Sequence, residues 1–411
     1  AVYGQPLVAG GRVIVATEED NIYALDPHDG SVIWQVNIGT PLRDVRAQVG
    51  CGNVDPLGIT GTPVADTAAG VVYAVGEVST GGRAPVSHQM VAVDIRTGRL
   101  LERVGVDPPL PAGESPLNLL QRAALALGNG RVYVGYGGHF GDCGTYHGWL
   151  VSVPSALRPG TGSATGTGSE GGTAGETAFN VTPSSTGGAV WGSGAAPALG
   201  ADGSVYVTTG NPNSAGPSPW AEAVVKLAPG LGPSPEVVFQ DRQATGDLDL
   251  STGGPVLLPG GELFAVGKTD TGYRLRQSDL LPLPAVRGTV CGSDPDGGSA
   301  FDAALDTLYV PCRGGGIQEI GLGRNRTGWR SGSANSTPIL AGGSLWALAY
   351  PAGTLQQLDP ATGRVLSSTA VGRPVPTFAS PSAASGLLLV PTRRGVVAYS
   401  GPAGPPASAR G

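Results

Sequence analysis

The hydrophobic positions of this chain follow a two-residue period over short stretches, which is typical of β-strands. The stretch NIYALDPHDGSVIWQVNIG, residues 21–39, is the clearest example, because apolar residues alternate with other side chains on both sides of DPHDG. That segment has turn chemistry, since an aspartate accepts from amides a few residues on and glycine takes a positive φ without strain. We predict a β-hairpin over these residues.

The same pattern recurs along the chain. The turn returns at 93–98 and 358–363, and a second piece recurs as a small strand that often carries proline, a turn usually rich in glycine, and a β-branched or aromatic strand. Copies of this second piece begin at Gln5, Gly61, Ala123, Ala196, Gly253, Ala300, Ser336 and Ala379. Eight copies in 411 residues give a period of about 50 residues, which predicts an all-β, eight-bladed β-propeller of four-stranded antiparallel blades. Seven blades is the alternative if the weak fifth unit is miscounted.

The pattern also predicts one domain over residues 1–400. The last unit ends at its third strand, so we expect it to lack an outer strand unless the first residues supply one. The Gly/Ser/Thr-rich residues at about 155–178 are predicted to be a flexible insertion, and 401–411 a flexible tail. Pro116 to Leu127 is the one helical candidate.

Composition narrows the possible partners. The net charge is −6 and the basic residues are scattered, so we expect no nucleic-acid partner. No apolar run approaches the ~18 residues needed for a transmembrane segment. There is no basic-then-apolar leader, so we expect any export signal to have been removed or omitted. Separately, we expect the protein to be a monomer.

The four cysteines are predicted to form two disulfides. Cys291 and Cys312 bracket one hairpin of the sixth unit, within bonding range, and Cys51 and Cys143 lie on long loops. The alternative is four buried thiols. Disulfides imply an oxidising, extracytoplasmic or secreted location.

Two of the four histidines and one aspartate lie among aromatic residues in YGGHFGDCGTYHGW, residues 136–149. His139, Asp142 and His147 give a weak prediction of a transition-metal site, and the alternative is a loop held by Cys143 and its own hydrogen bonds. His28 and His88 are predicted to be exposed turn residues.

The repeat resembles that of the quinoprotein dehydrogenase-like, or PQQ-binding-like, β-propellers, whose hairpin often ends in a docking tryptophan. The chain as a whole looks most like their secreted actinobacterial members. Catalytic members of this family hold pyrroloquinoline quinone (PQQ) on a calcium ion at the ring centre, so the resemblance implies PQQ and calcium as the cofactors to test.

The resemblance also implies roles for individual residues. GGAVWGSGAAPA is similar to the stretch with the tryptophan beneath PQQ, which would be Trp191, and VTTGNPNSAGPSPW to the stretch with a calcium-binding asparagine, Asn211. GDLDLSTGGPVLL resembles the region of the catalytic and metal-binding aspartates, with Asp249 or Asp247 in that place. VGKTDTGYRL resembles the stretch whose basic residue bonds the quinone, which would be Lys268.

Each match also has a structural explanation. Trp191 would pack between blades, Asn211 would cap its turn, the aspartates would face a turn or solvent, and Lys268 would be an exposed turn residue. The chain also departs from the family, because the segment that should carry a glutamate ligand has none and His139 or Asp142 is nearest. The adjacent cysteine pair of many members is missing, as is a haem-attachment motif.

Two hypotheses follow. The first is a non-catalytic or degenerate propeller that binds a small ligand, a metal or a protein partner. The second is a PQQ- and calcium-dependent dehydrogenase acting on an alcohol or sugar, in which the aspartate takes the hydroxyl proton. A scaffold for protein assembly is a weaker third. The incomplete calcium set favours the first.

Overall fold

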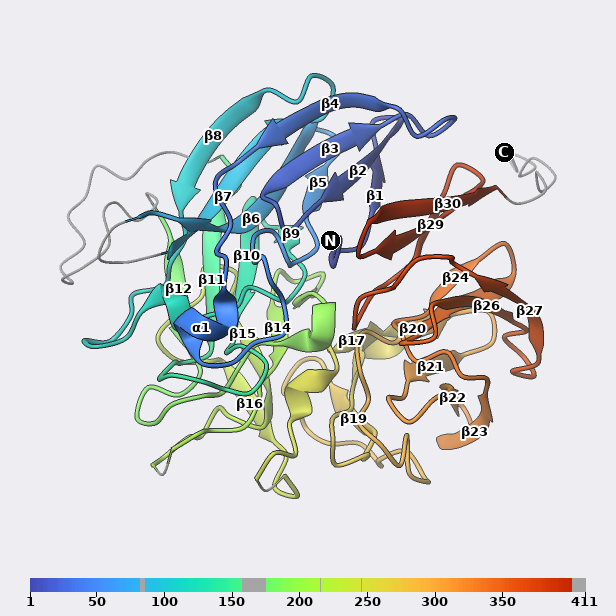
Figure 1. The fold of residues 1–411 in the computed structure, drawn as a ribbon. Coiled ribbons are helices and arrows are strands. Elements are labelled where there is room, and N and C mark those ends of the chain that lie inside the picture. The colour runs from blue at the N-terminus through green and yellow to red at the C-terminus, as the bar shows by residue number, and fades with distance from the viewer. Residues whose placement is uncertain (82–85, 157–174, 215, 245, 401–411) are drawn as a thin grey trace.

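Eight antiparallel sheets form a ring in the computed structural model of the chain (Figure 1). The structure describes residues 1–411 except 82–85, 157–174, 215, 245 and 401–411. The predicted eight-bladed β-propeller is therefore confirmed. Within the described residues, six blades have four strands, while the fifth and eighth have three.

Each of the first four blades is built from strands that follow one another in the chain. Blade 1 contains β1 (Leu7–Ala9), β2 (Arg12–Ala16), β3 (Asn21–Leu25) and β4 (Val32–Asn37); blade 2 contains β5 (Val64–Asp66), β6 (Val71–Ser79), β7 (Val86–Asp94) and β8 (Leu100–Gly105). Blade 3 contains β9 (Ala126–Gly128), β10 (Arg131–Tyr136), β11 (Trp149–Pro154) and β12 (Thr177–Asn180); blade 4 contains β13 (Ala198–Leu199), β14 (Val205–Thr208), β15 (Ala223–Leu227) and β16 (Val237–Gln240).

The last four blades repeat this arrangement. Blade 5 contains β17 (Val256–Leu258), β18 (Glu262–Ala265) and β19 (Tyr273–Arg276); blade 6 contains β20 (Ala300–Asp302), β21 (Thr307–Pro311), β22 (Ile317–Gly321) and β23 (Arg326–Ser331). Blade 7 contains β24 (Ile339–Ala341), β25 (Ser344–Ala349), β26 (Thr354–Leu358) and β27 (Val365–Ala370); blade 8 contains β28 (Ser382–Ala384), β29 (Leu387–Thr392) and β30 (Gly395–Ser400).

The recurring turn forms as its sequence predicts. In the first copy, the side chain of Asp26 accepts a hydrogen bond from the amide of His28 at 2.8 Å, and Gly30 has φ +73°. In the two later copies, Asp94 and Asp359 accept from the amides of Thr97 and Thr362 at 2.7 and 2.9 Å. The same local chemistry therefore closes the hairpin between the third and fourth strands of three blades.

Tryptophans on outer strands join neighbouring blades. Trp34 of β4 is buried, and its Nε1 donates to the carbonyl of Ile95 in blade 2 at 2.9 Å. A Cβ added at Gly98 would lie 2.7 Å from its ring, so the turn glycine leaves room for the indole. Trp329 of β23 lies in the same way against Gly363 of blade 7.

The first and last blades meet without sharing a sheet. The amide of Val2 donates to the carbonyl of Thr392 at the end of β29, at 3.1 Å, and Val2 packs with Val13 and Leu389. The first residues thus lie beside the second strand of blade 8, and they do not supply an outer strand next to β30. In blade 5, the place of an outer strand is taken by one bridge, between Leu275 and Pro282.

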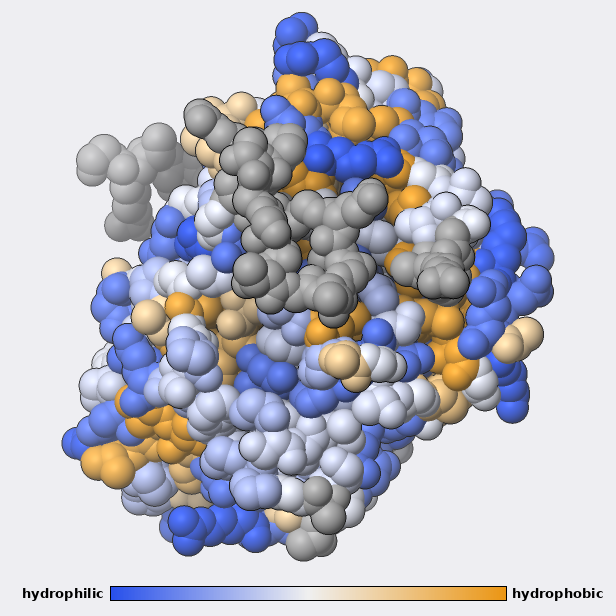
Figure 2. Space-filling view, turned by 90° about the vertical axis from the view of Figure 1, so that its left-hand side faces the viewer, coloured by the Kyte–Doolittle hydropathy of each residue, from blue (hydrophilic) through white to orange (hydrophobic). Residues whose placement is uncertain are grey.

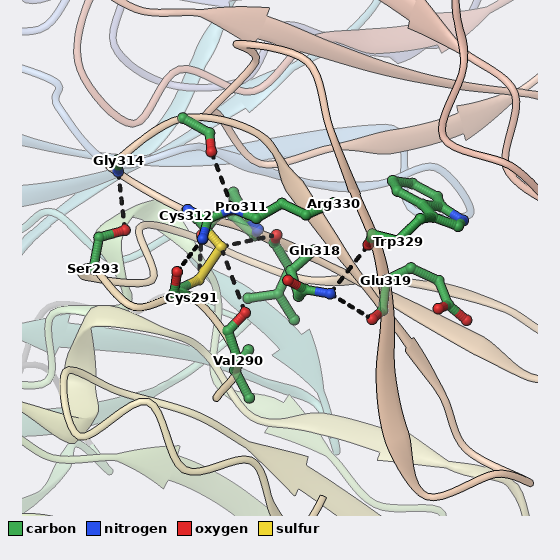
Figure 3. Close-up of a disulfide and its surroundings, with 12 residues drawn as sticks. Val290, Cys291, Ser293, Pro311, Cys312, Gly314, Gln318, Glu319, Trp329 and Arg330 are labelled. Carbon is green, nitrogen blue, oxygen red and sulfur yellow. Dashed lines mark hydrogen bonds between the residues drawn. A yellow bond between two sulfur atoms is a disulfide. The ribbon is translucent and has the colours of Figure 1, made fainter. Parts of the chain in front are cut away.

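Both predicted disulfides are present. Cys291–Cys312 ties the segment that precedes blade 6 to the end of β21, and Arg330 of β23 donates to the carbonyl of Cys291 (Figure 3). Cys51–Cys143 joins the connection between blades 1 and 2 to the β10–β11 loop of blade 3.

Several local predictions are wrong or concern residues that the structure does not describe. His28 is exposed as predicted, but His88 on β7 is fully buried, because its ring lies between β6 and the segment after β8 and bonds Asp107. The predicted helix at 116–127 is only the 3₁₀ turn η1 (Pro116–Asn118), whereas α1 (Val45–Val49) was not predicted. The insertion predicted at 155–178 lies mostly outside the described residues, and β12 begins at Thr177, inside that range; the predicted tail lies wholly outside.

Figure 2 shows one side of the molecule, where hydrophobic areas alternate with hydrophilic ones. The large apolar side chains at the surface include Val32, Ile33 and Leu100 on the outer strands of blades 1 and 2. Such dispersed exposure is ordinary for a folded domain. In the part of the chain that the structure describes, no helix has the length and apolar character needed to cross a membrane.

Candidate functional site

A cavity of about 330 Å³ lies where the loops of several blades converge. Its walls come from the β10–β11 loop of blade 3, the connection into blade 4, the β14–β15 loop, the connection into blade 5, the β18–β19 loop, and the segments around Arg313 and Phe378. Since these loops belong to blades on different sides of the ring, the cavity, named here the hub pocket, lies near the ring centre.

Seven of the eight residues singled out from the sequence line this pocket. The hub pocket contains Trp191, Asn211, Asp247, Asp249, Lys268, His139 and Asp142. His147 is not among its walls, and its Nδ1 lies 2.6 Å from Oε1 of Glu114. The structure thus brings together residues that are up to about 130 positions apart in the chain.

A lysine between two carboxylates forms the charged centre of the hub pocket. The Nζ of Lys268 lies 2.5 Å from Oδ1 of Asp247 and 2.9 Å from Oδ2 of Asp249. The side chains of Lys268 and Asp249 are 12% and 18% exposed, whereas Asp247 is 81% exposed, so Asp249 is the partner that is shielded from water.

Burial and the neighbouring charges shift the pKa values of Asp249 and Lys268 in opposite directions. Burial raises the pKa of Asp249, and the ammonium of Lys268 and a 2.9 Å hydrogen bond from the amide of Asn211 offset it only in part. Burial also lowers the pKa of Lys268, but the two carboxylates outweigh it and the pKa ends above its usual value. The lysine is therefore firmly cationic.

Asp142 and His139, on the β10–β11 loop, also form hydrogen bonds. The hydroxyl of Tyr146 donates to Oδ1 of Asp142 at 2.6 Å. The Nε2 of His139 lies 3.0 Å from the carbonyl of Leu117, which makes it the donor, and burial lowers the pKa of His139 to about 4. His139 is therefore neutral at physiological pH.

Aromatic rings supply the apolar surface of the hub pocket. Trp191 meets Phe378 edge to face, with ring centroids 6.5 Å apart, and packs from behind against an apolar cluster that includes Leu120. Phe140, which also lines the pocket, is 60% exposed. Its carbonyl accepts from the amide of Gly52 at 3.1 Å, beside the Cys51–Cys143 disulfide, so the β10–β11 loop is tied to the connection between blades 1 and 2.

The site residues predicted from the sequence do not include Arg313, Phe378 and Tyr146, which also line the pocket. Arg313 forms a bidentate pair with Asp296, at 2.6 and 2.9 Å, and a further pair with Asp294. Its position directly after Cys312, at the end of a predicted inner hairpin, was the signal available for it. Tyr146 lies in the polar segment 136–149, and its place there was its signal, whereas Phe378 had none beyond its aromatic character.

The donor set does not fit the calcium ion that the resemblance implies. Calcium takes six to eight oxygen ligands, whereas Asp249 is bound to the Lys268 ammonium and Asp142 to a tyrosine. The side-chain amide of Asn211 bonds Asp249 only when its nitrogen faces the carboxylate, which turns its oxygen away. Among the residues that the structure describes, no three His, Cys, Asp or Glu side chains are grouped to hold a metal.

Comparisons with known proteins agree with the fold. Residues 1–137 match the family described as outer membrane protein assembly factor BamB. BamB from Moraxella catarrhalis is similar in structure over 96% of this chain and 94% of its own, with 14% identity and a TM-score of 0.61. No curated protein sequence matches the chain.

Dehydrogenase structures are similar as well. The quinohemoprotein alcohol dehydrogenase from Comamonas testosteroni matches over 97% of this chain and 71% of its own, with 14% identity and a TM-score of 0.69. A europium-containing methanol dehydrogenase matches over 95% and 83%, with 14% identity and a TM-score of 0.67. These structures share the β-propeller fold with the chain, and one family model matches its first third; that the chain is a PQQ-like propeller of the actinobacterial type stays a prediction.

Proposed function

We propose that this protein is an exported, non-catalytic binding propeller that holds a small polar molecule in the hub pocket. The engagement of the pocket's reactive groups by one another carries this proposal, because Lys268 pairs with Asp249 and Asp247 while Tyr146 donates a hydrogen bond to Asp142. Groups fixed in this way serve as positioned donors and acceptors, and aromatic walls give a ligand apolar contact.

The charges of the pocket narrow the ligand class. Lys268 and Arg313 bring two positive charges, and Asp142, Asp247 and Asp249 bring three negative ones, so neither sign dominates. A neutral or zwitterionic molecule with many hydrogen-bonding groups matches such a lining better than a strongly charged one. The two disulfides support an oxidising compartment outside the cytoplasm.

The second candidate is a PQQ-dependent dehydrogenase. The convergence of Trp191, Asn211, Asp249 and Lys268 on one pocket favours it, since the resemblance assigns these residues to one cofactor site. The unsuitable calcium ligand set argues against it.

A titration distinguishes the two functions. The purified protein is titrated by calorimetry with PQQ alone, with PQQ plus calcium, and with a panel of neutral sugars and amino acids, followed by dye-reduction assays with alcohols and sugars. We expect a sugar or amino acid to bind without turnover, and Trp191→Ala to weaken that binding at least tenfold. Trp346→Ala, on β25 and outside the pocket walls, is the matched control.

Two results would reject the binding proposal. If PQQ binds only with calcium and dye reduction is lost in Asp249→Asn, the protein is a dehydrogenase. If a ligand binds equally well to wild type and Trp191→Ala, the hub pocket is not its site.

A further inference from the structure

Three acidic side chains are buried together between blades 1 and 2, away from the hub pocket walls. Glu18 and Asp20 lie on the turn between β2 and β3, and Glu77 lies on β6; they are 1%, 0% and 2% exposed. In the described part of the chain, both carboxyl oxygens of Asp20 and Glu77, and Oε1 of Glu18, have no hydrogen-bond partner. Acidic groups are almost never this buried without partners.

The carboxyl group of Asp20 fills a space between two glycines. A Cβ added at Gly58 or Gly76 would lie 2.7 or 2.6 Å from its Oδ1. The fully buried side chains of Ile38 and Ile59 lie at the same place, within the apolar core that joins blades 1 and 2. An ionised carboxylate is strongly disfavoured in such surroundings, because nothing there replaces its hydration.

The nearby cations do not form ion pairs with Glu18 or Asp20. The Ala1 amine and Arg122 act on Glu18 only at longer range, as Arg103 does on Asp20. Glu18 does accept from the amide of Gly58 and the hydroxyl of Thr60, at 2.9 and 3.0 Å.

Glu77 faces a histidine that is already engaged. The Nε2 of His88 is 3.7 Å from Oε2 of Glu77, while its Nδ1 lies 2.7 Å from Asp107. The other charged or titratable groups that interact with the three carboxyls are Glu19, Asp107, Tyr3 and Tyr136, in addition to the carboxyls themselves. Around these three carboxyl groups, the negative groups therefore outnumber the positive groups that contact them directly.

Burial is the main cause of the resulting pKa shifts. It raises the pKa of Glu18 to about 7, and burial together with Glu18 raises the pKa of Asp20 to about 8. Burial, Asp107 and the two other carboxyls raise the pKa of Glu77 well above its usual value.

We propose that the contact between blades 1 and 2 is a proton-dependent joint, in which folding places protons on Glu18, Asp20 and Glu77 that the unfolded chain does not hold. Neutral carboxyl groups fit the apolar seam, and their ionisation loosens it. The joint is therefore tightest in mildly acidic surroundings. This inference is independent of the ligand of the hub pocket.

The direction of the pH dependence follows from linkage. Because these carboxyls titrate at higher pH in the folded protein than in the unfolded chain, their contribution to stability is complete below about pH 4. It is lost as the pH rises through 7 to 8.

Urea unfolding between pH 5 and 8 tests the joint. We expect the unfolding equilibrium constant of the wild type to rise at least tenfold per pH unit between pH 5 and 7, which corresponds to one or more protons taken up on folding. Asp20→Asn should lower this slope by about one proton. Glu19→Gln, the exposed neighbour that pairs with Arg43, should keep the wild-type slope.

The comparison between variants assigns the protons, because Glu222 near the hub pocket also has a pKa raised to about 8 by burial. A wild-type profile that is flat from pH 5 to 7 would overturn the proposal, and so would an Asp20→Asn profile parallel to the wild type. If Asp20→Asn does not fold, Glu77→Gln is measured against Glu19→Gln with the same two outcomes.

Discussion

Replacing Lys268 by methionine tests whether the hub pocket depends on its central ion pair. Methionine keeps most of the aliphatic volume and removes the charge. At the observed 2.9 Å to Asp249, two unit charges attract by about 6 kcal/mol at an effective dielectric constant of about 20. Asp249, with 18% exposure, would then be a shielded carboxylate without its cation.

Protonation of Asp249 limits the loss of stability. With an ordinary pKa of 3.8, the cost of adding a proton at pH 7 is about 4 kcal/mol, at 1.36 kcal/mol per pKa unit. Breaking a buried pair commonly costs about 3–5 kcal/mol, so we expect Lys268→Met to lower the free energy of unfolding by about 3 kcal/mol at pH 7. The exposed Asp247 adds little.

The pH dependence gives the sharper measurement. In Lys268→Met, the pKa of Asp249 is higher in the folded protein than in the unfolded chain, so the deficit relative to wild type vanishes near pH 4 and grows toward pH 7. Urea unfolding at pH 4.5 and 7 measures both values. Lys226→Met removes the only other lysine of the sequence, whose partner Asp202 is 60% exposed at 3.5 Å, and should cost about 0–1 kcal/mol. Equal stability of Lys268→Met and wild type at pH 7 would refute the reasoning.

Three further predictions concern stability and are measured by urea unfolding at pH 7. Trp34→Ala should cost about 3–4 kcal/mol, since it removes a buried indole that bonds the next blade, and a cost below about 1 kcal/mol would contradict its docking role. Replacing both Cys291 and Cys312 by alanine should cost about 3 kcal/mol for a separation of 21 residues, and reductant should then have less effect on the variant than on the wild type. Tyr146→Phe should cost about 2 kcal/mol by removing the 2.6 Å hydrogen bond to Asp142, and an unchanged stability would show that the bond is replaced by water.

The fold could be predicted from the sequence because its signals are local and repeated. The Asp26 turn and its two copies each specify a hairpin without help from distant residues. The eight copies of the strand–turn–strand piece together outweigh the irregularity of any one of them. The fifth blade shows the limit of this argument. Its small strands match the repeat, but its outer strand is reduced to the Leu275–Pro282 bridge.

The candidate site was predictable in location but not in chemistry. Trp191, Asn211 and Lys268 each lie on a loop whose place in its blade follows from the repeat, and the ring brings such loops to one centre. Whether a carboxylate there faces a metal or a lysine depends on distances across blades, which no local pattern contains. The implied calcium set therefore gave way to the Lys268–Asp249 pair.

The buried acidic cluster shows a similar limit. From the sequence, His88 was predicted to be an exposed turn residue. In the structure, β6 and β7 are nine residues long each, and His88 pairs directly across from Glu77. The neighbouring strand β6 therefore determines the surroundings of His88. The turn signals in the sequence did not specify how long β6 and β7 are.

The contact between the first residues and blade 8 has a consequence for how the molecule fluctuates. Val2 bonds Thr392 and packs on Leu389, while β30 lies outermost among the described strands of its blade. A latch of this kind can release without breaking any sheet apart. Amide protons on β30 should therefore exchange with deuterium well before those on β10, which is paired on both sides, and transient opening of the whole toroid should begin at this latch.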